Sequence, residues 1–185
     1  TVAGLAMGTI VFIVASGLAL VFGLMDVLNF GHGVFLALGA YVAVSSFGAM
    51  AGYAASPSLA MNLVAVFAAI GIAMLAAGAL GLAFERVVVK PVYGHHLKQI
   101  LITMGGMIVG EELIKLVWGP VPIALPLPET LRGSFVIGEA IVEKFRVLAT
   151  VIGAVVFVVL AWVLARTKLG LLIRAGVENR EMVEA

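Results

Sequence analysis

Long apolar runs separated by short polar stretches dominate the pattern of this chain. Residues 4–24 contain no charge, residues 59–84 form a second uninterrupted run, and residues 147–165 form a third. A helix needs about 20 apolar residues to cross the hydrocarbon core of a bilayer. Each run therefore predicts a membrane-spanning helix.

Two further runs carry polar residues. Residues 34–44 are too short to cross alone, but counted from Val27 the run is long enough and includes Asn29 and His32. Residues 100–118 are charged in their second half. Together the five runs predict an all-α fold, a polytopic transmembrane helical bundle with about five spans.

Spacings of four recur inside these runs. Glu111 and Lys115 are four apart, in the order that favours an ion pair on one helix face. Gly106 and Gly110 share the same spacing, and so do two glycines in the first run, Gly4 and Gly8. Small residues four apart allow helices in lipid to approach closely, so we interpret both pairs as helix-packing sites.

The connections give the orientation. Residues 48–58 predict a loop, residues 85–99 a polar connection, and residues 119–146 contain four prolines and cannot form a continuous helix. Lysine and arginine in residues 85–99 and 166–185 place both segments in the cytoplasm by the positive-inside bias. Two spans lie between them, so residues 119–146 are expected outside, as a periplasmic loop.

Composition narrows the class of protein. Hydrophobic residues make up 63% of the 185 and charged residues 11%, against about 45–50% and 25% in soluble domains. A net charge of +1 gives no basic field for nucleic acid, and the absence of cysteine excludes thiol catalysis and Cys-ligated metals. Neither a phosphate-binding loop nor a zinc-protease motif is present. We therefore expect an integral membrane protein that is not an enzyme, with no catalytic residue and no metal.

The strongest internal candidate is the run Asn29-Phe30-Gly31-His32-Gly33. Two glycines loosen a helix and expose its backbone, which is tolerated at membrane depth only inside protein or beside a water-filled cavity. Asn29 and His32 would then line a polar translocation path or bind a zwitterionic solute. In the alternative interpretation, both side chains bond to neighbouring backbone and only shape the break.

Residues 167–185 follow the last span directly and carry charges of both signs. They predict a water-exposed helix at the membrane surface that docks a soluble partner; the alternative is an ordinary solvated loop between spans. Arg174 with Glu178, and Arg180 with Glu184, are four apart and each pair supports a helix by about 0.2–0.5 kcal/mol. Because the chain ends inside this charged pattern, we expect it to be a fragment of a longer protein.

Motifs along nearly the whole chain resemble the bacterial branched-chain amino acid ABC transporter permease family. In order, they are Gly17-Leu18 through Phe22-Gly23, Asn29-Phe30-Gly31-His32-Gly33, Leu38-Gly39-Ala40-Tyr41, Phe84-Glu85-Arg86, Lys90-Pro91-Val92-Tyr93, Gln99-Ile100-Leu101-Ile102-Thr103, Arg166-Thr167-Lys168-Leu169-Gly170 and Ile173-Arg174-Ala175. The resemblance implies a single permease domain over residues 1–185, truncated relative to the family, in the bacterial inner membrane. It also implies a second, different permease subunit, a periplasmic solute-binding protein, and cytoplasmic ATP-binding cassette subunits that hold ATP, with no cofactor in this chain.

The implied function is uptake of branched-chain amino acids by an ATP-driven importer. The same family includes permeases for urea and short amides, and a stand-alone secondary transporter or channel is the remaining alternative. The segment from residue 170 onward would pass ATPase closure to the spans, although it departs from the EAA-type loop of other importers. The expected coupling residues are Gly170, Arg174, Ala175, Asn179, Arg180, Glu181 and Glu184.

Overall fold

The computed structural model describes residues 2–25, 29–137, 140–168 and 170–171. The predicted helical bundle is confirmed. Four of the described helices are long and apolar enough to cross a membrane, with windows at Gly4–Val21, His32–Ala49, Leu59–Val92 and Lys144–Arg166. A fifth, α5 (His96–Trp118), has 23 residues but carries more charge. The chain divides into two units, each with its own internal packing.

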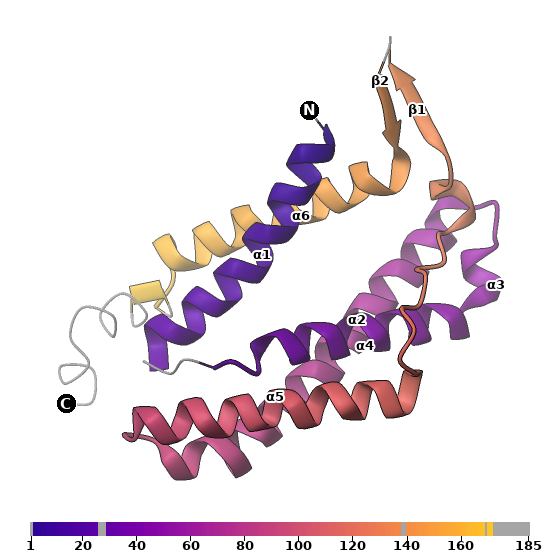
Figure 1. The fold of residues 1–185 in the computed structure, drawn as a ribbon. Helices are drawn as coiled ribbons and strands as arrows, with labels where there is room; N and C mark the ends of the chain where they lie inside the picture. Colours follow the sequence, from indigo (N-terminus) through magenta and orange to yellow (C-terminus); the bar gives the residue numbers. More distant parts are fainter. Residues whose placement is uncertain (1, 26–28, 138–139, 169, 172–185) are drawn as a thin grey trace. The chain divides into compact units, whose positions relative to one another are not determined.

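The first unit combines α1 (Val2–Met25) with the chain from Gly133 onward. Here α1 packs on α6 (Lys144–Arg166), as Figure 1 shows. Gly153 on α6 lies so near Thr9 that an added Cβ would be 2.5 Å from the Cβ of Thr9. A short antiparallel hairpin, β1 (Ser134–Ile137) and β2 (Ala140–Glu143), leads directly into α6.

The second unit contains α2 (His32–Ala49), α3 (Ala51–Ala54), α4 (Leu59–Phe84) and α5. Gly106 and Gly110 confirm the predicted packing face of α5. An added Cβ on Gly106 would lie 2.5 Å from the ring of Phe84 on α4, and one on Gly110 would overlap Val34 on α2.

The other glycine pair makes no packing contact among the described residues. Nothing lies within 4 Å of a Cβ added to Gly4 or Gly8. Spacing alone does not say which face of a helix meets a neighbour. On α1 that contact is made at Thr9 and Phe12 instead, the latter ring being 5.1 Å from that of Phe157.

The polar connection predicted at residues 85–99 is largely helical. α4 continues as a π-helical turn (Glu85–Val89) and a 3₁₀ turn (Lys90–Val92). Pro91 lacks the N–H that an α-helix needs at this point, so the helix changes its hydrogen-bond pattern and ends. Gly94, at φ +80°, then reverses the chain into α5, a conformation that favours glycine.

Two other connections are partly ordered as well. The loop predicted at residues 48–58 contains the end of α2 and the single turn of α3. α5 ends at Gly119, whose φ of +87° suits a glycine at a helix C-terminus, and Pro120 follows. The prediction that residues 119–146 do not form a continuous helix is confirmed: extended chain, a 3₁₀ turn (Glu129–Leu131) and the hairpin occupy them.

Candidate functional site

The run from Asn29 to Gly33 forms the turn that starts α2. Oδ1 of Asn29 accepts a hydrogen bond of 3.0 Å from the backbone N–H of Gly31. The backbone carbonyl of Asn29 accepts a second one, of 3.1 Å, from the backbone N–H of His32. This is an Asx turn, in which a side chain imitates backbone geometry. Asn29 therefore lies in the turn before α2 and not in the helix itself. Its side chain competes with helical hydrogen bonding and favours the turn.

Gly31 brings this turn against α5. The residue is buried, and an added Cβ would lie 3.7 Å from the carbonyl oxygen of Thr103 and 3.1 Å from Oδ1 of Asn29. Thr103 is fully buried, and its hydroxyl donates to the carbonyl of Gln99 on the same helix. Gly33, in contrast, is exposed and has open space around it. Only the first of the two glycines is required by packing.

His32 and Asn29 each keep polar atoms that the described structure does not use. Nε2 of His32 is buried and has no hydrogen-bond partner among the described residues. The amide nitrogen of Asn29 likewise makes no hydrogen bond to the described part of the chain, because only its oxygen serves the turn. A buried polar atom without a hydrogen-bond partner lowers the stability of the folded protein by about 1–3 kcal/mol. Such atoms are found at functional sites, where they bind a ligand or take part in a reaction.

The start of the expected coupling segment is described as far as residue 171. Thr167 ends α6: its hydroxyl donates to the carbonyl of Val163 at 2.6 Å and accepts from the N–H of Gly170 at 3.2 Å. Gly170 is buried, and an added Cβ would overlap the carbonyls of Val163 and Leu164. A glycine is therefore needed where the chain turns back on the end of α6. The other expected coupling residues, from Arg174 to Glu184, lie outside the described residues.

Comparison with known proteins decides the family. The profile described as branched-chain amino acid transport system / permease component matches residues 1–185. This chain belongs to that family. The family assignment made from the motifs is thereby confirmed.

Three curated relatives in this permease family are longer than the chain. The high-affinity branched-chain amino acid transport system permease protein BraD of Pseudomonas aeruginosa is 27% identical over 97% of this chain and 58% of its own length. Two permease proteins of the same transport system, both named LivH, come from Salmonella typhimurium and Escherichia coli K12. They are 27% and 28% identical to this chain over 84% of its length and 48% of their own. The chain thus spans about half the length of these relatives. No solved structure matched it.

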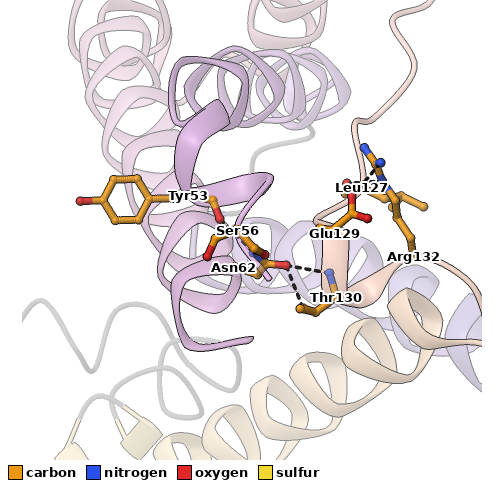
Figure 2. Close-up of polar contacts among 7 residues, drawn as sticks. All are labelled: Tyr53, Ser56, Asn62, Leu127, Glu129, Thr130 and Arg132. Atoms are coloured by element: carbon orange, nitrogen blue, oxygen red, sulfur yellow. Dashed lines mark hydrogen bonds and ion pairs between the residues drawn. The ribbon is translucent and has the colours of Figure 1, made fainter. Parts of the chain in front are cut away.

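One residue that the sequence did not single out organises the end of the second unit at which α4 begins. Asn62 on α4 is completely buried. Its amide nitrogen donates to the carbonyls of Tyr53 and Ser56 at 2.8 and 2.9 Å, and its oxygen accepts from the backbone and hydroxyl of Thr130 at 2.9 and 2.8 Å. Figure 2 shows Asn62 between these groups. The only signal was an asparagine in the first turn of an apolar span.

The ion pair in the charged half of α5 has a different partner from the one predicted by the spacing of Glu111 and Lys115. Nζ of Lys115 lies 2.7 Å from Oε1 of Glu112, so Lys115 pairs three residues back and not with Glu111. Both partners are about half exposed or more. At this end Trp118 donates from its indole N–H to the hydroxyl of Ser45 on α2 at 2.7 Å, which ties α5 to its neighbour.

No group of three or more His, Asp or Glu side chains in the described ranges is placed to hold a metal ion. The polar atoms at the start of α2, Nε2 of His32 and the amide nitrogen of Asn29, are separate groups without partners among the described residues. Such atoms can hold a solute by hydrogen bonds.

Proposed function

We propose that this permease-family chain is the membrane-spanning subunit of an ATP-driven importer for branched-chain amino acids. The observation that carries the proposal is the match of the family profile to the entire chain, together with relatives whose titles name that transport system. The proposed location is the bacterial inner membrane. The connection at residues 85–99 and the tail at 166–185 face the cytoplasm, and residues 119–146 face the periplasm.

The proposed translocation path passes the turn at the start of α2, with Asn29, Gly31, His32 and Gly33. The unused amide nitrogen of Asn29 is a donor for the carboxylate of an amino acid, and Nε2 of His32 is a second polar atom for the same solute. Gly31 lets this turn lie against α5. A break in a span that presents polar groups is how many transporters bind a solute at membrane depth.

The proposed partners are two ATP-binding cassette subunits that carry ATP, a second permease subunit and a periplasmic solute-binding protein. Gly170, Arg174, Ala175, Asn179, Arg180, Glu181 and Glu184 form the proposed coupling surface. The tight turn at Gly170 supports this proposal, because it joins the tail closely to the end of α6. Movement of the tail would therefore reach a membrane-spanning helix directly.

Reconstitution of the purified full-length polypeptide alone tests the proposal. In proteoliposomes without ATPase subunits, we expect no uptake of leucine under an imposed proton or sodium gradient. Gradient-driven uptake by the single polypeptide would contradict the proposal and support a secondary transporter. A matched panel with urea and acetamide, measured on the complete complex, separates the amino acid permease from an amide permease.

A further inference from the structure

An apolar groove of about 1050 Å³ runs through the second unit. α2, α4 with its π-helical continuation, and α5 form its walls. The lining side chains are aliphatic or aromatic, with Phe35, Leu80, Val87 and Val109 among them. Lys98 is the one charged residue among those that line it. An apolar channel with a cation at one end matches an amphiphile with an anionic head.

The groove also has a suitable length. Its lining on α5 extends from Lys98 to Leu113, which is about 22 Å at a rise of about 1.5 Å per residue. Half of the roughly 30 Å hydrocarbon core of a bilayer is about 15 Å, the depth that one leaflet's acyl chains fill. An acyl chain from the leaflet nearest Lys98 therefore fits within the groove.

Two further cations belong to the same end of the unit. Arg86 and Lys90 lie on the short helical turns that also contribute Val87, Val88 and Val92 to the groove. The side chains of Arg86, Lys90 and Lys98 are exposed, and none forms an ion pair within the described part of the chain. Basic clusters between membrane helices on the cytoplasmic side are suited to anionic lipid head groups.

From this geometry we infer that the groove holds one acyl chain of an anionic phospholipid of the cytoplasmic leaflet, with its phosphate at Lys98. The inference uses the membrane orientation proposed above, but neither the transported solute nor the partner subunits. The lipid would fill the space between α4 and α5 next to the contact of Gly106 with Phe84. It would thereby hold these two helices at a fixed separation.

Photo-crosslinking of the full-length protein tests this site. The probe is phosphatidylglycerol with a photoreactive group in its acyl chain, added to nanodiscs of phosphatidylcholine, with adducts mapped by mass spectrometry. We expect adducts on the groove-lining residues of α4 and α5. Gly105→Leu should abolish them, because Gly105 lines the groove and has open space for a larger side chain. Gly78→Leu, on α4 with equally open surroundings but outside the lining, is the matched control and should keep them.

Charge at Lys98 is tested in the same assay. Lys98→Gln should weaken labelling by phosphatidylglycerol about fivefold, the effect of roughly one cation near an anionic surface, and Lys98→Arg should retain it. Equal labelling of the wild type and Gly105→Leu would overturn the inference. So would absence of adducts in the wild type, which is the result expected if another span or a second copy fills the groove. Because no ATPase or solute is present, neither result bears on the proposed transport.

Discussion

The side chain of Asn29 has two polar atoms, one with a structural role and one available for a role in transport. Its oxygen is used by the turn at the start of α2, and its amide nitrogen makes no hydrogen bond to the described residues. The two interpretations of this run that the sequence left open therefore apply to different atoms. A substitution that keeps the oxygen and removes the amide nitrogen tells them apart.

Asn29→Asp is that substitution. Aspartate keeps the acceptor of the Asx turn, so the melting temperature of the purified protein should stay close to that of the wild type. We expect leucine uptake by the assembled importer to fall about tenfold or more, because a hydrogen bond to a charged solute is worth about 1.5–3 kcal/mol. Normal uptake by this variant would show that Asn29 only shapes the turn.

Asn62 shows how one buried polar residue fixes a loop. Its four hydrogen bonds measure 2.8–2.9 Å: two link α4 to the carbonyls of Tyr53 and Ser56, and two link it to Thr130. The peptide carbonyl of Ser56 and the peptide N–H of Thr130 bond to it, and each group left without a partner costs about 1–3 kcal/mol. The residue therefore contributes to stability well beyond its size.

Asn62→Leu is expected to lower the free energy of unfolding by about 2–4 kcal/mol, since water reaches only some of the released groups. It should also speed tryptic cleavage after Arg132, two residues from the released Thr130. The control is Val64→Ala, at an exposed position one half-turn further along α4, which should change stability by about 0.5 kcal/mol or less. Unchanged cleavage in Asn62→Leu would contradict the role of Asn62 in holding this segment.

At the scale of elements, the helices followed from the apolar runs because run length dictates spanning. α4 begins at residue 59 and reaches Phe84 as predicted. The connections could not be predicted equally well. The polarity of residues 85–99 predicts that they lie outside the hydrocarbon, but it does not distinguish a loop from a helical turn. The helical turns continue past Glu85, the first charged residue, and end near Pro91.

The hairpin before α6 was missed for a similar reason. Its strands have four residues each, so they offer too little alternation to distinguish from loop. The sequence also did not predict which helices contact each other. Apolar residues lie all round these helices, so no single apolar face identifies the packed side. Glycine spacing identified the packed face of α5 but not the face of α1 that meets α6.

Two adjacent glycines on α5 give a matched test of helix packing. Gly106→Ala places a methyl group 2.5 Å from the ring of Phe84, so it should destabilise the protein by about 1–3 kcal/mol through overpacking. Gly105→Ala meets nothing within 4 Å and should stabilise the helix by up to about 1 kcal/mol. Thermal unfolding in detergent measures both. Equal effects of the two substitutions would mean that α4 and α5 are not in contact at Gly106.

At the scale of the whole molecule, the family assignment identifies this set of spans as permease sequence. The chain matches the permease profile from end to end, and it spans about half the length of its curated relatives. The turn at Gly170 leads from α6 into the charged tail. This tail is the segment for which we propose contact with an ATPase subunit.

Arg174→Glu tests that role. Reversal of one charge on a docking surface costs several kcal/mol through repulsion of like charges, so co-purification of the ATPase subunits with the permease should be lost. Membrane insertion should be unaffected, because the residue lies outside the apolar runs that predict the spans. Arg174→Lys is the control that keeps the charge. ATP hydrolysis stimulated by solute at the wild-type level in Arg174→Glu would contradict the docking role.

The central claim is that this chain moves branched-chain amino acids only when an ATPase drives it. The most direct measurement is uptake of labelled leucine by proteoliposomes that contain the complete complex, with the solute-binding protein outside and ATP inside. We expect uptake that stops when ATP is replaced by a non-hydrolysable analogue or when the ATPase subunits are omitted. Uptake that persists unchanged without the ATPase subunits would contradict the account.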